Sequence, residues 1–587
     1  MNILGLVYTS HDAGLALLTA GRPRIILEEE RFNRIKHTLK YPRLAMDDVF
    51  GAHSDLKLSD IDVITAPWDQ ARIRRSIFNA VTAQMPASLN LLRNAAHPTH
   101  TTGLVSLPFR LRLGLLGQYG IKYGLMGTPP IVQVGHHESH AAIFFASPFE
   151  EATILVTDGY GDDGATSAWT GRGNKIEKQW SDPMFDSLGM LYTAVSEHLG
   201  FKFTEEGTVM ALAALGTPAY KDKFKDLIQL LPEGRIAINK SYIKYDTHGL
   251  IEPFKPKFYA LFGPRRKREE PITEHHHNIA WALQHWTEEA LLHMTRELYR
   301  VNKSKNLVIS GGVALNCVAN ARILNETDFE RVWVPPVASD TGVSFGSTLY
   351  HWHNTLGNKR EFELTHAFYG KEFTDAEIVA ALNAADLKYE RMSEGDLLRR
   401  VAKDLSEQKI VGWFQGRAEI GPRALGNRSI LSSASSNAMK DLINARIKHR
   451  EAFRPFAPVV LIEHLSEYFE YDHPDPFMTM APKIRADKLS VIPAAAHVDG
   501  TGRIQTIDRK ANPRYYGVIE EYAKLTGVHV ILNTSFNRQE PVVNSPAEAI
   551  SCYLRTDMDR VVLGDFYVQD RNPEAIKRAF ATFAKKA

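Results

Sequence analysis

The stretch ATILVTDGYGDDGATSAW, residues 152–169, joins an apolar run of strand-forming residues to an aspartate and a glycine-rich turn. Two other stretches also follow an apolar run with a glycine turn, ILGLVYTSHDAGLALL at residues 3–18 and NLVISGGVALNCVANARIL at residues 306–324. Between them lie longer segments with helical spacing, such as residues 279–299. Short strands that end at glycine turns and alternate with helices are typical of α/β proteins. The first part of the chain therefore predicts a mixed α/β domain.

The length of 587 residues exceeds what one hydrophobic core usually organises, so we expect two large domains. A polar passage without a periodic pattern, residues 353–370, indicates the boundary and predicts domains at 1–357 and 363–587. Beyond the boundary, helices are predicted near residues 375–385 and 394–407. Strands are predicted in KIVGWFQG (409–416) and VHVILNTSFN (528–537). The second domain is therefore also expected to be α/β.

The balance of 70 basic and 68 acidic residues gives no overall signal for a nucleic-acid partner. The two cysteines, Cys317 and Cys552, exclude a disulfide framework and a zinc finger and favour a reducing cytoplasm. No signal peptide or membrane partner is expected, because the apolar runs are far shorter than the roughly 20 residues that span a bilayer. The basic and apolar segment 104–126 favours a partly buried helical insertion over a membrane-surface role.

Two histidines in GHHESHAA, residues 135–142, have the spacing of metal ligands on a helix. His136 and His140 are four residues apart and would share one helix face, although such pairs are often surface or core residues. Asp158 ends an apolar strand, and Asp340 in VASDTGVSFG precedes a predicted helix. Nitrogen and oxygen ligands without thiolate favour iron, manganese or zinc over copper(I).

Glycine turns and one further histidine suggest where substrates bind. Backbone N–H groups at turns such as SGGVALN, with Gly311 and Gly312, can hold phosphates, although each such glycine alone could simply close a turn. His11 in TSHDAG is a candidate base toward a hydroxyl, because histidine titrates near neutrality. The alternative is that His11 caps a turn beside Asp12.

The stretch GRAEIGPRALGNRS, residues 416–429, concentrates Arg417, Arg423 and Arg428 among glycines and a proline. An arginine fork matches phosphate or carboxylate oxygens in two parallel hydrogen bonds. The alternative is a solvated charged face. Because glycine and proline fix turns, the pattern favours rigid loops that hold the charges against a dianion.

The motifs LGL…HDAG, EEERFNRIKH, HHESH, TDGYGDDG, SGGVALN and SDTG, in this order, resemble the N-terminal domain of the NodU/CmcH-type O-carbamoyltransferases. The resemblance implies an actin-like ATPase (Kae1-like) fold and a metal, typically Fe²⁺, bound by His136, His140, Asp158 and Asp340. It also implies that His11 and Asp12 are catalytic. Glu206, Gly207, Gly311, Gly312 and Asn316 would bind nucleotide or carbamoyl-adenylate. Thr208 stands where the family pattern suggests a lysine, which puts any charge contact there in doubt.

The strings GPRALGNRS, KHREAFRPFAP and LNTSFN resemble the C-terminal, YrdC-like α/β domain of the same family, over residues 365–570. By this resemblance one set of residues surrounds carbamoyl phosphate and the ATP phosphates: Arg417, Arg423, Arg428, Lys448, Arg454, Arg503 and Ser535.

The activity that this resemblance implies is ATP-dependent O-carbamoyl transfer. Carbamoyl phosphate and ATP, with Mg²⁺, would give carbamoyl-adenylate, from which the carbamoyl group passes to a hydroxyl of a small secondary metabolite such as an antibiotic. The acceptor pocket is expected in residues 68–126 or 240–268, where loops vary. Two alternatives stay open: an enzyme of threonylcarbamoyl-adenosine synthesis on tRNA, and a nucleotide-binding regulatory protein without catalysis.

Overall fold

The computed structural model describes residues 1–587 except 9–10, 52–53, 93–128, 452 and 587. The segment 104–126, for which a helical insertion is predicted, lies outside the described residues. Among the helices that the structure describes, none combines the length and the apolar character needed to cross a bilayer. The chain separates into two compact units: Met1–Glu29 with His37–Leu364, called the first unit, and Glu30–Lys36 with Thr365–Ala587, called the second unit.

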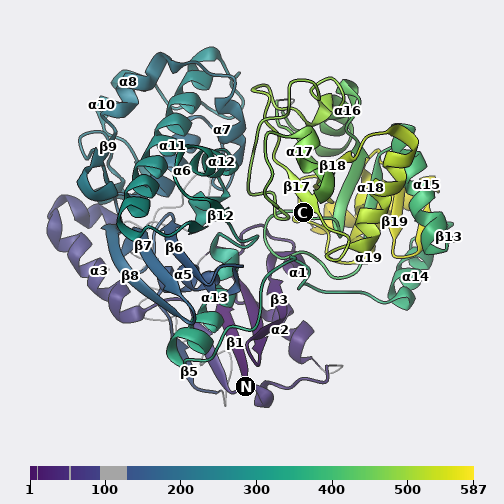
Figure 1. Ribbon diagram of the computed structural model, residues 1–587, viewed down its shortest axis with the longest axis horizontal. Helices are drawn as coiled ribbons and strands as arrows, with labels where there is room; N and C mark the ends of the chain where they lie inside the picture. The colour runs from purple at the N-terminus through teal and green to yellow at the C-terminus, as the bar shows by residue number, and fades with distance from the viewer. Residues whose placement is uncertain (9–10, 52–53, 93–128, 452, 587) are drawn as a thin grey trace. The chain divides into compact units, whose positions relative to one another are not determined.

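The first unit contains two five-stranded sheets (Figure 1). The first sheet has the order β3-β2-β1-β4-β5. Its strands are β1 (Asn2–Val7), β2 (Gly14–Thr19), β3 (Arg22–Glu28), β4 (Val63–Ala66) and β5 (Ile131–Gln133). The second sheet has the order β12-β11-β6-β7-β8. Its strands are β6 (Glu151–Thr157), β7 (Gly164–Arg172), β8 (Lys175–Pro183), β11 (Asn306–Ser310) and β12 (Arg331–Trp333).

The two sheets share one topology. Each begins with three consecutive antiparallel strands, β1 to β3 in one and β6 to β8 in the other. The first strand of each set then pairs in parallel with β4 or β11, which pairs in parallel with β5 or β12. The central strand β6 is buried at every position after its first, as expected for a strand covered on both faces. The first unit is thus built from a repeated sheet.

Helices connect and cover these sheets. They are α2 (Arg43–Phe50), α3 (Gln70–Ala83), α5 (His136–Ala141), α6 (Leu188–His198), α7 (Glu206–Ala213), α8 (Lys221–Lys225), α9 (Tyr245–His248), α10 (Pro256–Phe262), α11 (Glu274–Asn302), α12 (Cys317–Glu326) and α13 (Val343–Leu349), with a hairpin of β9 (Ile228–Leu231) and β10 (Arg235–Ile238). The helical spacing predicted over 279–299 falls within α11, and its apolar face, including Ile279 and Leu283, is fully buried.

Helix α13 packs against β1, β2 and α5. At Gly346 a Cβ atom would lie only 1.9 Å from the carbonyl oxygen of Ser139, so α13 and α5 touch backbone to backbone. Only glycine permits this approach. It brings Asp340, which precedes α13, close to the two predicted histidine ligands on α5.

The second unit is built on one eight-stranded mixed sheet, in the order β13-β20-β19-β14-β15-β18-β16-β17 (Figure 1). Its strands are β13 (Glu390–Arg391), β14 (Val411–Phe414), β15 (Arg428–Ser433), β16 (Ala457–Leu461), β17 (Gln505–Ile507), β18 (Val530–Ser535), β19 (Arg560–Leu563) and β20 (Phe566–Val568). Its helices are α1 (Glu30–Asn33), α14 (Asp375–Ala384), α15 (Glu394–Ser406), α16 (Asn437–Ile443), α17 (Leu465–Tyr468), α18 (Pro513–Thr526), α19 (Pro546–Arg555) and α20 (Pro573–Lys586). The α/β character predicted for this part of the chain is confirmed.

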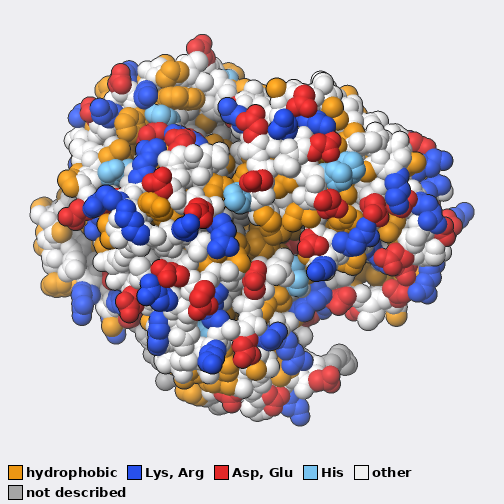
Figure 2. Space-filling model, viewed as in Figure 1, with side chains coloured by type: hydrophobic (Ala, Val, Ile, Leu, Met, Phe, Trp, Pro, Cys, Tyr) orange, Lys and Arg blue, Asp and Glu red, His pale blue; other side chains and the backbone are white. Residues whose placement is uncertain are grey.

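Acidic and basic side chains intermingle on the face shown in Figure 2. This distribution matches the near balance of 70 basic and 68 acidic residues. Charge that could attract an anion must therefore be sought in local clusters within each unit.

Candidate functional site

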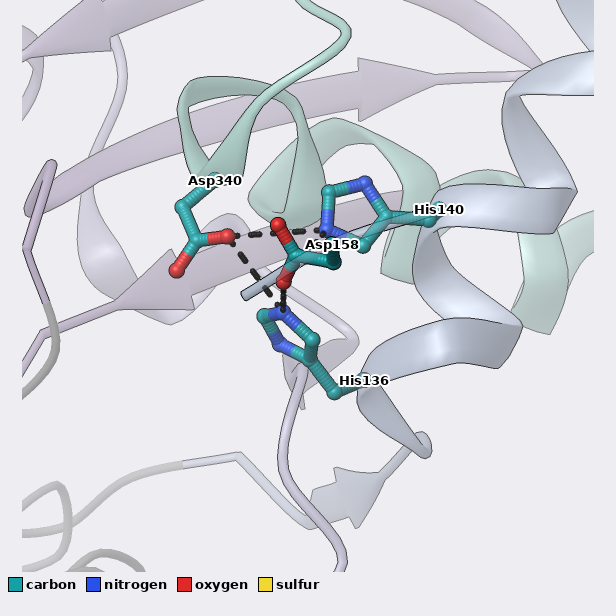
Figure 3. A group of neighbouring side chains, drawn as sticks. All are labelled: His136, His140, Asp158 and Asp340. Atoms are coloured by element: carbon teal, nitrogen blue, oxygen red, sulfur yellow. Dashed lines mark hydrogen bonds and ion pairs between the residues drawn. The ribbon is translucent and has the colours of Figure 1, made fainter. Parts of the chain in front are cut away.

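Four side chains of the first unit converge in one buried cluster (Figure 3). His136 and His140 lie one turn apart on α5. Asp158 directly follows β6, and Asp340 begins the short 3-10 turn that leads into α13. One nitrogen or oxygen atom from each residue lies within 4.8 Å of the others. The fold thus brings together the four residues whose types and positions suggested a metal site.

The distances in this cluster suit a single ion. His136 Nε2 lies 3.3 Å from Asp158 Oδ2 and 3.3 Å from Asp340 Oδ1. His140 Nε2 lies 3.5 Å from Asp340 Oδ1 and 3.9 Å from Asp158 Oδ2. Ligand atoms that share a metal at about 2.1 Å, at angles between tetrahedral and octahedral values, lie roughly 3.0–3.5 Å apart. Three of the four separations fall in that range.

Burial and charge also favour a cation in the cluster. Both histidines are fully buried, and Asp158 and Asp340 are 8% and 3% exposed. His140 Nε2 and Asp340 Oδ1 are buried without a hydrogen-bond partner among the described residues. Burial alone would lower the pKa of His136, but Asp340 and Asp158 outweigh it and raise the pKa to about 10. Two buried carboxylates beside two imidazoles form a set of ligands that fits a divalent ion.

Neighbouring side chains hold the ligands in place. Asp162 Oδ2 accepts the backbone N–H of His136 at 2.7 Å, where α5 begins. The ring of Trp68 stacks on that of His136, with 4.0 Å between centroids. Ser310 Oγ lies 3.3 Å from His140 Nδ1. Sequence reasoning did not single out these supports, although Asp162 lies in the TDGYGDDG motif that it quoted. Such supports orient metal ligands in known sites.

The glycine doublet of SGGVALN lies against the same cluster. The backbone N–H of Gly312 donates to Asp158 Oδ1 at 2.9 Å. Gly311 has φ +94°, and a Cβ atom there would lie 2.1 Å from the carbonyl oxygen of Thr157. Only glycine allows this close crossing of the ends of β6 and β11. The doublet therefore orients Asp158, while its contact with a nucleotide stays a prediction.

His11 lies between two carboxylates. His11 Nδ1 is 2.9 Å from Asp12 Oδ2, and His11 Nε2 is 3.7 Å from Asp340 Oδ2. Asp12 has a second imidazole partner, because His37 Nδ1 lies 2.6 Å from Asp12 Oδ1. Burial would lower the pKa of His11, but Asp340 and Asp12 raise it to about 10, and a cation beside Asp340 would oppose that rise.

His37 is the residue that sequence reasoning missed here. It ends the quoted motif EEERFNRIKH, and that position was its only signal. Burial would raise the pKa of Asp12, but His37 and His11 outweigh it and hold the pKa well below its usual range. The Asp12 carboxylate is therefore anionic and fixes both rings.

The other predicted nucleotide-binding residues lie on α7 and at the start of α12, and both helices pack against α11. Glu206 begins α7 and accepts a hydrogen bond from the Thr193 hydroxyl at 2.7 Å. Gly207 follows it and is exposed. The Asn316 side chain caps α12 and donates to Gln284 Oε1 at 3.0 Å. Their contact with a nucleotide stays a prediction.

In the second unit, a buried carboxylate shapes the arginine-rich turn at residues 416–429. Glu419 is 3% exposed. Its Oε1 atom accepts the backbone N–H groups of Leu425 at 2.8 Å, Asn427 at 2.7 Å and Arg428 at 3.0 Å. Three backbone donors that point at one oxygen fix the turn as a rigid structure. The quoted stretch contains this glutamate, but sequence reasoning gave it no role.

Arg428 braces the same turn from inside. Its guanidinium is fully buried and lies 3.7 Å from the centroid of the Phe414 ring. It donates at 2.6–3.2 Å to four backbone carbonyl oxygens, those of Gln415, Asn427, Gly416 and Lys371. Because these carbonyls occupy the arginine fork, the structure differs from the predicted phosphate contact at this residue. We assign Arg428 to the support of the turn.

The other two arginines of the turn are placed differently. Arg417 donates to the carbonyl oxygens of Gly370 at 3.0 Å and Tyr369 at 2.8 Å, so its fork is also partly engaged with backbone. Arg423 is only half-buried and lies at the tip of the turn, after an exposed proline. The contact of Arg417 and Arg423 with a ligand stays a prediction.

Lys448 and Ser535 do come together. Lys448 is 3% exposed, and its Nζ atom lies 3.2 Å from Ser535 Oγ and 2.7 Å from Asn537 Oδ1. The carbonyl oxygens of Ser535 and Asn537 accept from the same amine at 2.5 and 2.8 Å. Burial, followed by repulsion from Arg450, holds the pKa of Lys448 well below its usual range.

Further cations surround Arg450. Burial, then repulsion from Arg454 and Arg503, lowers the pKa of Arg450 to about 9. Arg454 and Arg503 are themselves half-buried. Because these partly buried guanidinium groups repel one another, an anion bound among them would stabilise their charged forms. Arg450 lies in the motif KHREAFRPFAP but is not among the residues predicted to surround the phosphates.

A short segment from the N-terminal part of the chain also belongs to this unit. Arg31 is 5% exposed and donates from Nη2 to the carbonyl oxygen of Gly421 at 2.8 Å. Arg34 donates to the carbonyl oxygens of Val542 at 2.8 Å and Pro541 at 2.5 Å. The segment 30–36 therefore contacts the arginine-rich turn through Arg31 and the chain at residues 541–542 through Arg34.

Comparison with known proteins gives matches over nearly the whole chain. The family models described as carbamoyltransferase N-terminus and carbamoyltransferase C-terminus match residues 2–349 and 402–570. An uncharacterised protein of Synechocystis sp. is 37% identical, over 96% of each chain. The nodulation protein NolNO of Sinorhizobium fredii is 35% identical, over 96% of this chain and 79% of that protein. The nodulation protein NolO of Bradyrhizobium diazoefficiens is 36% identical, over 75% of this chain and 79% of that protein.

Proposed function

Since this chain belongs to the carbamoyltransferase family, we propose that it divides an ATP-dependent O-carbamoyl transfer between its two units. In the second unit, carbamoyl phosphate, ATP and water would give carbamoyl-adenylate, phosphate and pyrophosphate. In the first unit, the carbamoyl group would pass from the adenylate to a hydroxyl of a small molecule. AMP would then leave, and the hydroxyl proton would pass to a base.

The observation that carries this proposal is the contrast between the two clusters. The second unit gathers four basic side chains, Lys448, Arg450, Arg454 and Arg503, and carries Arg423 on the arginine-rich turn. Such groups would neutralise phosphates. The first unit gathers buried carboxylates and imidazoles, which suit a metal and a base. Formation of the carbamoyl-adenylate and transfer of the carbamoyl group to a hydroxyl need these different environments.

In the first unit, His136, His140, Asp158 and Asp340 would hold a divalent ion, Fe²⁺ or one with similar ligand preferences. When bound, such an ion acts as a Lewis acid that polarises a carbonyl oxygen. His11 is oriented by Asp12, which His37 holds from its other oxygen. We propose that His11 takes the proton of the acceptor hydroxyl at Nε2, and that His37 is a positioning residue.

The architecture supports the finer parts of the proposal. The repeated sheet of the first unit supports an actin-like ATPase fold there. We propose a YrdC-like fold for the second unit on the arginine, lysine and serine motifs that it carries. Glu206, Gly207 and Asn316 would then contact the nucleotide part of the adenylate. Cys317 and Cys552 are buried and form no disulfide, which suits the reducing cytoplasm that we propose as the location.

The direct test uses the purified chain with ATP, Mg²⁺ and carbamoyl phosphate and without any acceptor. We expect pyrophosphate release that depends on carbamoyl phosphate, and a carbamoyl-adenylate that can be trapped and identified by mass spectrometry. Nucleotide binding without pyrophosphate release would contradict the proposal and favour a regulatory protein. Screening hydroxyl compounds for the mass gain of one carbamoyl group would then identify the acceptor class.

The position of Arg31 allows a second prediction. Arg31→Ala removes a charge-assisted hydrogen bond to Gly421 in the turn that carries Arg423. Such bonds contribute about 1.5–3 kcal/mol, so we expect the KM for carbamoyl phosphate in pyrophosphate release to rise roughly tenfold or more. Arg31→Lys should restore part of the loss.

Arg43→Ala serves as the control, because the side chain of Arg43 is 82% exposed and pairs only with a neighbour on its own helix among the contacts described. It should leave both kinetic constants unchanged. An unchanged KM in Arg31→Ala would show that the segment 30–36 does not position the turn.

A further inference from the structure

A second group of metal-binding side chains lies in the second unit, apart from the cations described above. His464 ends a short 3-10 turn after β16, Glu467 lies on α17, and His529 directly precedes β18. One nitrogen or oxygen atom from each lies within 4.8 Å of the other two. His464 and Glu467 are about one-third and two-fifths exposed, so solvent ions reach this group.

Strand pairing fixes this arrangement. β16 and β18 run antiparallel, with Val460 opposite Val530. The backbone N–H of Leu461 also faces the carbonyl oxygen of His529, at 3.4 Å. The chain after β16 and the chain before β18 therefore leave the sheet at the same edge. His464 and His529 follow and precede these paired ends, which keeps the two rings together without a long loop.

The two imidazoles stack face to face. Their centroids are 3.5 Å apart and their planes differ by 10°. The in-plane lone pairs of two stacked rings run nearly parallel, so both nitrogens reach one ion only after one ring turns about its side-chain bonds. A neutral imidazole is the form that binds metals.

The third member supplies an oxygen. Glu467 Oε2 lies 3.1 Å from His464 Nδ1, while its other oxygen, Oε1, pairs with Lys488 at 2.7 Å. Lys488 thus orients the carboxylate and leaves Oε2 on the histidine side. Tyr468 lies behind His529, with its hydroxyl 3.5 Å from Nδ1 of that ring. That contact leaves Nε2 of His529 as the nitrogen that can face an ion.

We propose that His464, Glu467 and His529 form a second, solvent-exposed metal site whose expected occupant is Zn²⁺. Two imidazoles and one carboxylate are a ligand set that zinc accepts, with a fourth position left for water. Compared with the buried cluster of the first unit, this site has one ligand fewer and stays open to solvent. It should therefore bind more weakly and exchange its ion faster.

The test is a Zn²⁺ titration by calorimetry on the full chain, freed of metal with a chelator and carrying no affinity histidines. We expect a weak class of sites near one equivalent, distinct from any tight class. His464→Ala and His529→Ala should each weaken that class at least about tenfold, and Glu467→Gln should weaken it while preserving shape. Co²⁺ in place of Zn²⁺ should give visible absorption that the same variants lose.

Two control variants separate this site from other histidines. His473→Ala removes another exposed histidine beside a carboxylate in the same unit, and His277→Ala interrupts the run at residues 275–277. Both should retain the weak class. The proposal is overturned if no weak class appears, if the class survives in His464→Ala and His529→Ala, or if the controls lose it equally.

The same titration keeps this proposal separate from the proposed carbamoyl transfer. His136→Ala should remove only the tight class and leave the weak class intact. A failure of the buried site therefore leaves the exposed site testable. Thermal unfolding of each variant in chelator should match that of the parent protein, since all three side chains lie at the surface and contribute little to the core.

Discussion

The His136→Ala enzyme is expected to release pyrophosphate at nearly the normal rate and to transfer the carbamoyl group at least about a hundredfold more slowly. His136 Nε2 lies 3.3 Å from both Asp158 Oδ2 and Asp340 Oδ1. The variant therefore loses the nitrogen ligand that adjoins both carboxylates. Lewis-acid polarisation supplies several kcal/mol of catalysis, and each 1.36 kcal/mol is tenfold in rate. The second unit keeps all of its cations.

The measurement compares acceptor carbamoylation, pyrophosphate release and metal content in the same preparations. His353→Ala is the matched control, because His353 is a buried histidine of the same unit that contacts the carbonyl of Asn358 and lies outside the cluster. It should retain metal and transfer. If His136→Ala lost pyrophosphate release in parallel with transfer, the two steps would not be divided between the units as proposed.

The Glu419→Ala variant is expected to lose the ordered turn at residues 416–429. Alanine leaves the backbone N–H groups of Leu425, Asn427 and Arg428 without their acceptor. Each buried donor left unpaired costs about 1–3 kcal/mol, so the second unit should lose about 3 kcal/mol or more of its free energy of unfolding. Pyrophosphate release should fall at least tenfold, because the same turn carries Arg423.

Hydrogen exchange gives the local measurement. The amides of Leu425, Asn427 and Arg428 should exchange much faster in Glu419→Ala, while amides of the first unit keep their rates. Glu419→Gln is the matched variant: its carbonyl oxygen can still accept the three donors, and the other carboxylate oxygen has no hydrogen-bond partner to lose among the described residues. Equal protection in the alanine variant and the parent would refute the role given to Glu419.

Much of the first unit follows from local sequence patterns. The spacing of His136 and His140 needs only a helix to place both rings on one face, and α5 provides it. Asp158 and Asp340 stand where a strand ends and where a helix begins, which are positions that local patterns identify. The local structure at these four residues is as predicted, because it is set by the few residues next to each of them.

The remaining features depend on tertiary contacts. His37 reaches Asp12 only because the chain returns to the first sheet after the segment 30–36. The residue type and the turn predicted a phosphate contact for Arg428, but its place at the start of β15 buries it against Phe414 and four carbonyls. Glu419 accepts three backbone N–H groups only because the turn folds around its carboxylate. The spacing of residues along the sequence does not show which side chains the fold surrounds.

The path of the chain at residues 30–36 has a consequence for how the protein can be divided. The polypeptide passes between the two units at 29/30, at 36/37 and again at 364/365. A fragment that starts at Thr365 would lack Arg31 and Arg34, and with them the hydrogen bonds to the carbonyl oxygens of Gly421 and Val542. Separate production of residues 365–587 would need the seven residues 30–36 attached again or supplied as a peptide.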